Sequence, residues 1–187
     1  MVNSKAPAPI RVKVNRAPVL TLWAAVIAER LGFDRDEALT MGRAVAGLNA
    51  SAKGKSLGIF KPVPEAVRHE RKRLPEGEAV HVELLHRAVP VVRTPAGLRA
   101  VSKGSAIAPE SVQRYLEARF GEHLAAVETA MRGLARIVPP EELAHRAYEV
   151  YETFRPEVPA GTRGWGAMGI LDLDRIRAAG RAVKARR

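Results

Sequence analysis

The side chains with the clearest capacity for chemistry in this sequence are cations gathered in short runs. Residues 68–73 read Arg-His-Glu-Arg-Lys-Arg, and lysines precede this run at short intervals. Such cations suit contact with phosphates, because affinity from counterion release requires positive charge and no particular geometry. A solvated charged surface would give the same run, and both interpretations stay open. The phosphate-contact candidates of this region are Lys53, Lys55, Arg71, Lys72 and Arg73.

A second basic group near the C-terminus falls at helical spacing. Arg177, Arg181 and Lys184 are separated by four and three residues, which places them on one face of a helix. Asp172 and Asp174 begin this predicted helix, where carboxylates suit the positive end of the helix dipole. We expect the basic face to form a second surface for phosphate contact.

The net charge of the chain is large and unevenly distributed. The formal charge is +11 over 187 residues, with +8 in residues 1–73, −3 in residues 110–160 and +5 in residues 161–187. A surplus of this size favours nucleic acid or an anionic membrane surface as the partner. No apolar run reaches the roughly 20 residues that a bilayer span requires, so we expect nucleic acid and no membrane.

Residues 24–44 combine two helical patterns around a glycine. Ala28 stands four positions before Gly32, so a small side chain leaves room for two helices to cross closely at a sharp turn. The segment resembles the helix-turn-helix unit of DNA-binding proteins, over about a tenth of the chain. The apolar positions that such a unit requires are filled by Ile27, Leu31, Phe33, Ala38 and Met41.

The resemblance implies that the second helix presents its N-terminal residues to the major groove of DNA. Arg35, Thr40 and Arg43 would then face the groove, although Asp36 and Glu37 bring negative charge to the same end of the helix. The resemblance also implies a homodimer, because paired reading heads are common in this class. A plain helical hairpin has the same glycine turn and is the alternative interpretation.

A glycine-rich loop occupies residues 161–169. Its glycines match the spacing of a dinucleotide-binding loop, but no strand precedes them and no acidic partner for a ribose follows. Backbone amides there could still form an anion-binding nest or a stacking platform. A tight turn that packs its tryptophan into the core is the other interpretation. The candidate anion-loop residues are Arg163, Gly164, Trp165 and Gly166.

The sequence predicts no metal, no cofactor and no catalytic centre. Glu142 and His145 have the spacing of half a di-iron site, but a second such pair is absent. The serines stand in no nucleophile motif. The chain has no cysteine, which excludes a disulfide framework and thiolate-ligated zinc and fits a cytoplasmic location.

Local patterns in the first part of the chain predict an arm, a helical pair and a connection. Residues 1–16, with two prolines and four basic side chains, are expected to form a flexible arm. Apolar spacings of three and four predict an amphipathic helix over 18–31, and Asp34 with Glu37 begins a second helix as a capping box. A polar connection over 51–78 follows, with a short helix around 64–72.

The rest of the chain is expected to contain three short strands followed by helices. Valine-rich and leucine-rich runs over 80–85, 89–93 and 98–101 are separated by turn residues, as in a small antiparallel meander. A long apolar stripe predicts one continuous helix from Pro109 through Leu134. A further helix over 140–154 is expected to form a hairpin with it, before the terminal helix.

These patterns predict a mainly α protein with a small antiparallel β meander, in the α+β class. The expected parts are the arm of residues 1–16, a basic helical region over 17–78 and a β-plus-helical region over 79–187, or one compact domain over 17–187. The function that these features favour is non-enzymatic binding of nucleic acid, with DNA ahead of RNA, in a nucleoid-associated protein.

Two other classes of function remain open at this stage. One is a small enzyme or binding protein for an anionic small molecule, with the loop at 161–169 as the anion clamp. The other is a protein-interaction module that docks through the acidic residues 110–160.

Overall fold

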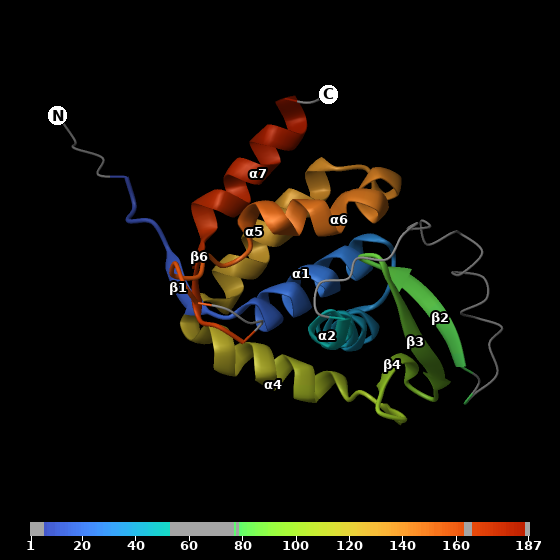
Figure 1. The fold of residues 1–187 in the computed structure, drawn as a ribbon. Helices are drawn as coiled ribbons and strands as arrows, with labels where there is room; N and C mark the ends of the chain where they lie inside the picture. Colours follow the sequence, from blue (N-terminus) through green and yellow to red (C-terminus); the bar gives the residue numbers. More distant parts are fainter. Residues whose placement is uncertain (1–5, 53–76, 78, 163–165, 186–187) are drawn as a thin grey trace.

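The computed structural model describes residues 6–52, 77, 79–162 and 166–185. This part of the chain is mainly helical with two small antiparallel sheets (Figure 1), in agreement with the α+β class. The predicted helix around 64–72 lies outside the described residues. The helices are α1 (Arg16–Arg30), α2 (Arg35–Ala52), α4 (Pro109–Phe120), α5 (Leu124–Ile137), α6 (Pro140–Phe154) and α7 (Leu173–Ala185), with the 3-10 turn η1 (Gly121–His123). The strands are β1 (Arg11–Val14), β2 (Ala79–Leu84), β3 (Arg87–Thr94), β4 (Gly97–Ser102), β5 (Ser105–Ala106) and β6 (Gly169–Asp172).

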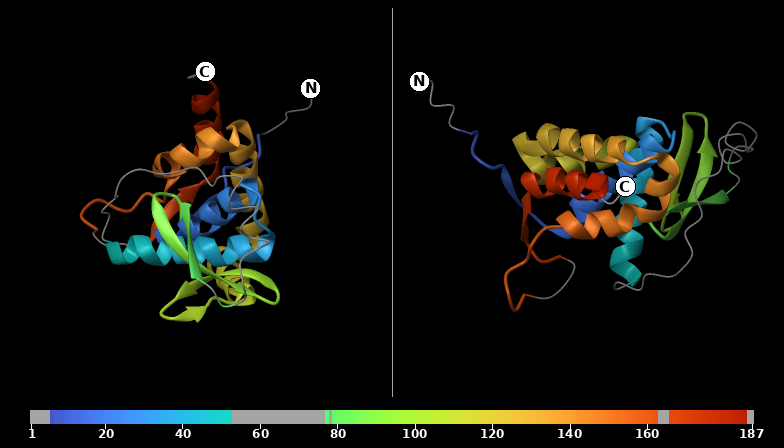
Figure 2. Two further views of the ribbon diagram at one scale, coloured as in Figure 1. Left: turned by 90° about the vertical axis from the view of Figure 1, so that its right-hand side faces the viewer. Right: turned by 90° about the horizontal axis from the view of Figure 1, so that it is seen from above.

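Helix α1 is buried on every side. All residues from Pro18 to Ala28 are buried, and α2, α4, α5 and α6 pack around the helix (Figures 1 and 2). The expectation of an amphipathic helix with one apolar face is therefore wrong. A helix whose surface is apolar all round is stable only inside the protein, and its one buried hydroxyl, on Thr21, donates to the carbonyl of Ala17 over 2.8 Å. No described helix has the length and apolarity of a membrane span.

The turn between α1 and α2 has the predicted geometry. Gly32 adopts a φ of 107°, a conformation that a residue without a Cβ reaches at no steric cost. The backbone N–H of Asp34 donates to the Glu37 carboxylate over 3.1 Å, which is the backward bond of a capping box. The predicted helical pair joined at Gly32 is confirmed.

The predicted meander is confirmed and packs against α2. The sheet has the order β2-β3-β4-β5, with antiparallel neighbours throughout, and β3 and β4 contact α2. The hairpin between β2 and β3 turns at Leu85 and His86, whose φ values are 48° and 60°. Two successive residues with positive φ match the right-handed twist of the flanking strands.

Three expectations about the helices and the N-terminal arm are wrong. Residues 11–14 form β1, which pairs with β6, and the side chains of Val12 and Val14 are buried. The long helix from Pro109 is divided into α4 and α5 at Gly121, whose φ is 56°. Helices α5 and α6 pack on α1 and α7 instead of forming a hairpin with each other, because burial of α1 requires a neighbour on each side.

Helices α1 and α2 cross closely at Gly42. A Cβ atom at this buried position would overlap the backbone oxygen of Thr21 and lie 2.9 Å from the backbone nitrogen of Ala25. At Gly47, one turn later in α2 and exposed, a Cβ would meet nothing within 4 Å. The close crossing of α1 and α2 therefore requires a glycine at position 42, whereas position 47 has room for a side chain.

We expect Gly42→Ala to lower the free energy of unfolding by at least about 2 kcal/mol, because the backbones of α1 and α2 must separate. Gly47→Ala is the matched control and should raise it by about 0.5–1 kcal/mol, because alanine loses less backbone entropy in a helix. Denaturant unfolding of both variants measures the difference. Equal stabilities would show that the crossing does not need a glycine.

Candidate functional site

Arg35 is part of an ion-pair network that joins four helices. Its guanidinium donates to Glu29 of α1 over 3.0 Å, to Gln113 of α4 over 3.1 Å and to Glu128 of α5. Arg132 of α5 donates to the same two carboxylates over 3.1 and 2.8 Å. The expectation that Arg35 faces a DNA groove is not met, because its donors are used within the protein and its role is to tie α2 to its neighbours.

Thr40 and Glu37 cover the edge of strand β4. The hydroxyl of Thr40 accepts from the backbone N–H of Ala100 over 3.0 Å, and the Glu37 carboxylate accepts from that of Leu98 over 3.2 Å. Thr40 is fully buried, and its hydroxyl donates to the carbonyl of Glu37. The expectation that Thr40 reaches a groove is therefore wrong. A sheet edge leaves N–H groups that need partners, and this face of α2 supplies them.

Arg43 packs on an aromatic ring near the surface. Its guanidinium carbon lies 4.3 Å from the centre of the Tyr115 ring, and that of Arg119 lies 5.6 Å away. Burial raises the pKa of Tyr115, and the two arginine charges oppose that rise. Arg43 is half-buried while Arg119 is exposed, so this basic-aromatic group presents positive charge at the junction of α2 and α4.

Several predicted residues lie outside the part of the chain that the structure describes. This holds for the basic cluster of the connection and for residues 163–165 of the glycine-rich loop, whose Gly166 is an exposed turn residue. The Glu142 carboxylate of the Glu-x-x-His pair accepts from Arg146 over 2.7 Å. The remaining phosphate-contact and anion-loop candidates, outside the description, are Lys53, Lys55, Arg71, Lys72, Arg73, Arg163, Gly164 and Trp165.

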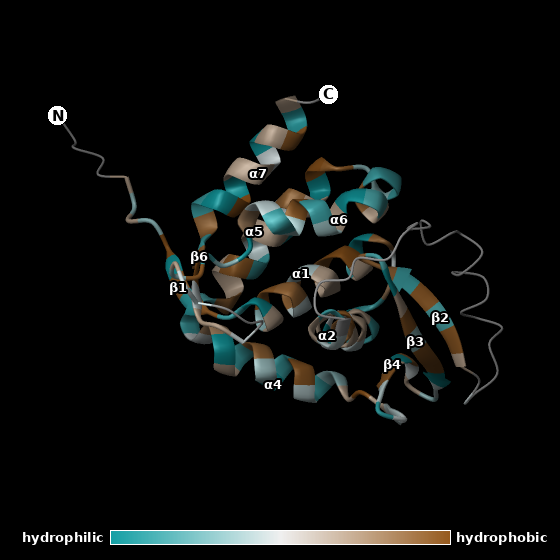
Figure 3. Ribbon diagram, viewed as in Figure 1, coloured by the Kyte–Doolittle hydropathy of each residue, from teal (hydrophilic) through white to brown (hydrophobic). Residues whose placement is uncertain are grey.

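Helix α7 carries the predicted basic face. Arg177, Arg181 and Lys184 are all exposed, and Arg177 bonds the equally exposed Asp174 over 3.0 Å. Asp172 caps the helix by accepting from the backbone N–H of Asp174. Hydrophilic and apolar segments alternate along α7 (Figure 3), and its apolar residues pack on α5 and α6. Among the described residues, Arg181 and Lys184 have no acidic partner, so their charge is available to a ligand.

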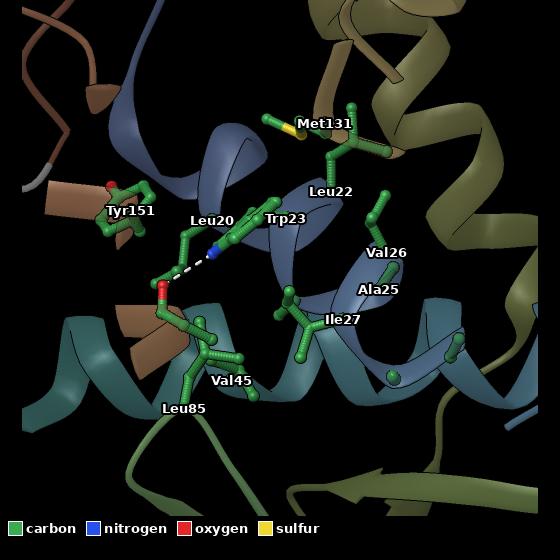
Figure 4. Close-up of a cluster of buried hydrophobic side chains, with 14 of the residues drawn as sticks. Leu20, Leu22, Trp23, Ala25, Val26, Ile27, Val45, Leu85, Met131 and Tyr151 are labelled. Carbon is green, nitrogen blue, oxygen red and sulfur yellow. Dashed lines mark hydrogen bonds between the residues drawn. The ribbon is translucent and has the colours of Figure 1, made fainter. Parts of the chain in front are cut away.

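The core contains an aromatic cluster that the sequence patterns did not predict. Tyr151 of α6 stacks edge-on against Phe154 at 5.9 Å, and Phe154 in turn packs on Trp23 of α1 at 5.3 Å. The indole N–H of Trp23 donates to the Ala147 carbonyl over 2.8 Å (Figure 4). In the same view Tyr151 and Val26 lie at opposite ends of the cluster.

The hydroxyl of Tyr151 is buried close to positive charge. Burial raises the pKa of Tyr151, whereas the charges of Arg16 and Arg155 act to lower it. These groups come from α1 and from the end of α6, more than 130 positions apart in the chain. No sequence signal marks them, because a tyrosine at helical spacing in an apolar stripe is also what a plain core requires.

Comparison of the chain with protein-family models, with curated proteins and with solved structures finds no significant match. The arguments about function therefore use the geometry of the described residues.

Thr40→Val tests whether the hydroxyl of Thr40 contacts DNA or serves as the hydrogen-bond acceptor for the backbone of β4. Valine keeps the shape but leaves the N–H of Ala100 without its partner, so we expect a loss of about 1–3 kcal/mol in the free energy of unfolding. Binding of the folded variant to DNA should be unchanged. Thr129→Val, at an exposed position of α5, is the control and should change stability by less than about 0.5 kcal/mol. Weaker DNA binding with unchanged stability would contradict this role.

Because of the ion-pair network, the free energy of unfolding should decrease as the pH falls into the acid range. Burial by itself raises the pKa of the Glu128 carboxyl, but hydrogen bonds from Arg132 and Arg35 outweigh it and hold the pKa below its usual value. A lowered carboxyl pKa stabilises the fold above the unfolded pKa of about 4.5, and that contribution is lost as pH falls through the folded value. The stabilisation is therefore present at neutral pH.

Glu128→Gln should lower the free energy of unfolding by about 1–2 kcal/mol at pH 7. The variant should also lose less stability than the natural chain between pH 5 and pH 3, as measured by denaturant unfolding at each pH. Glu122→Gln, whose side chain is almost fully exposed, is the control and should follow the natural profile. Parallel pH profiles for all three chains would show that the network does not set this dependence.

Proposed function

We propose that the protein binds duplex DNA through phosphate contacts, without reading its sequence. The observation that carries this proposal is the exposed basic face of α7, formed by Arg177, Arg181 and Lys184. A net charge of +11 adds a long-range attraction to any polyanion. Contacts to the DNA backbone position a protein but carry no sequence information, so the expected binding is non-specific.

The length of the basic face suits a duplex. Seven residues of α-helix rise about 10 Å, and duplex DNA carries one negative charge per roughly 1.7 Å of its axis. A duplex lying along α7 therefore offers several phosphates within reach of the three side chains. Helix α7 lies at the periphery of the molecule (Figure 1), where a rod-shaped partner can approach it.

Groove reading by α2 is not part of this proposal. The residues that a helix-turn-helix unit would present are engaged by β4, α4 and α5, as Thr40 and Arg35 show. The homodimer was expected only because helix-turn-helix units commonly bind DNA in pairs. Since α2 is not proposed to read a groove, the proposal is stated for a single chain. Arg43, half-buried, and Arg119, exposed, lie on Tyr115 and form a second source of positive charge.

The test compares two triple variants of equal net charge. Replacing Arg177, Arg181 and Lys184 with Gln removes the α7 face. Replacing Lys13, Lys103 and Arg136 with Gln removes three exposed cations from separate parts of the chain. We expect the α7 variant to bind a duplex at least about tenfold more weakly near 0.1 M salt. Its slope of log affinity against log salt should fall by about one per lost contact.

Mobility shifts across a salt series, with duplex DNA, single strands and structured RNA, measure these quantities. The scattered variant should lose distinctly less affinity than the α7 variant. No binding at low salt, binding that ignores salt, or equal losses in the two variants would refute the α7 surface. Tighter binding to structured RNA than to the duplex would refute the choice of DNA.

A further inference from the structure

Three segments that are far apart in the sequence meet at the start of α1. Trp23 of α1 bonds Ala147 of α6, and nearer the start of α1 the charge of Arg16 is close to Tyr148 and Tyr151. Tyr148 and Tyr151 lie 5.8 Å apart between ring centres, and the ring of His86, in the β2–β3 turn, lies 6.3 Å from that of Tyr148.

Buried polar atoms without partners gather at this place. Within the described part of the chain, the Tyr151 hydroxyl, the Arg16 Nε and the Asn15 side-chain oxygen are buried and have no hydrogen-bond partner. Tyr151 is 1% exposed. The great majority of buried polar atoms in proteins are hydrogen-bonded, so these three unpaired atoms mark the start of α1 as a candidate site for a polar ligand.

The first turn of α1 has no side-chain cap. Asn15 is the N-cap residue, but its side chain makes no capping hydrogen bond. An N-cap oxygen accepts from the second or third N–H of a helix, and the third residue of α1 is Pro18, which has no N–H. The positive end of the helix dipole therefore has no side-chain oxygen from Asn15 against it, and such a terminus attracts phosphate.

The charges around the cluster have a positive sum. The positive charges of Arg16, Arg87 and Arg155 act on Tyr148, and the one acidic residue that opposes them is the exposed Glu152. Burial is the largest influence on Tyr151 and raises its pKa. The hydroxyl thus keeps its proton at neutral pH and can donate it to an acceptor.

We propose that a phosphate group binds at the start of α1, held by Arg16, Arg155 and the hydroxyl of Tyr151. Guanidinium groups match the oxygens of a phosphate in number and geometry, and the tyrosine supplies a neutral donor from the buried side. Rotation of the Asn15 amide by half a turn exchanges its oxygen for its nitrogen, which adds another donor. The ligand is a free phosphate ester or a backbone phosphate of nucleic acid.

This site is independent of the α7 surface, since the two share no residue. The experiment uses the full chain and inorganic phosphate as the probe, with chloride added to keep the ionic strength constant. Isothermal calorimetry should show one saturable event, and the thermal midpoint should rise with the logarithm of phosphate concentration once the site is saturated. The α7 triple variant should bind phosphate unchanged, which separates the two proposals.

Tyr151→Phe removes the hydroxyl and keeps the ring. In phosphate-free buffer it should melt at a higher temperature than the natural chain, because an unpaired buried group is lost. Its phosphate Kd should rise about tenfold, as should that of Arg16→Gln, since a hydrogen bond to a charged group is lost in each. Tyr115→Phe and Arg136→Gln are the controls and should keep the natural Kd.

A nucleoside monophosphate and a short duplex distinguish the two sources of phosphate. Loss of monophosphate binding in Arg16→Gln with unchanged duplex affinity supports a small phosphate ester as the ligand, and loss of duplex affinity supports the backbone. Absence of saturable phosphate binding overturns the proposal. So does a phosphate Kd that neither Tyr151→Phe nor Arg16→Gln alters.

Discussion

A helix with an apolar surface all round must be enclosed by other elements, and α1 imposes this requirement on the whole chain. Helices α2, α4, α5 and α6 each cover a part of it. Where α2 crosses, Gly42 lets the two backbones touch. Where α6 crosses, the indole of Trp23 finds a carbonyl partner in Ala147. Helix α7 in turn docks on α5 and α6, two of the helices that cover α1.

Because α2 packs on α1, the positions of its polar residues and their hydrogen-bond partners are also fixed. With one face on α1, the next face of α2 meets strand β4, and Glu37 and Thr40 satisfy the backbone N–H groups of its edge. Arg35 lies where α2 meets three other helices and joins carboxylates from two of them. A segment with the spacing of a helix-turn-helix unit is thus used for packing, and the glycine turn serves a close helical hairpin.

Two places on the described part of the chain hold positive charge that packing between the helices does not use, namely α7 and the start of α1. On α7 the apolar side is buried and the basic side is exposed, so that Arg181 and Lys184 face solvent. At the start of α1, Arg16 stands at an uncapped terminus beside a buried hydroxyl. The first place suits many weak contacts to a polyanion, because its side chains are exposed to solvent. The second is the place proposed for one compact anion, because the Tyr151 hydroxyl and the Arg16 Nε are buried there without partners.

The sequence by itself determined the local elements: the turn at Gly32, the capping box at Glu37, the meander and the basic face of α7 depend on residues close together in the chain. Tertiary structure alone decided the pairing of β1 with β6, the burial of Thr40 and the cluster at Tyr151. These involve contacts such as that of Arg35 with Glu128, 93 positions away, and Trp23 with Ala147, 124 positions away. Periodicity indicates which side of a helix is apolar, but which polar residues become buried depends on the partner that covers them, and that partner is set by the enclosure of α1.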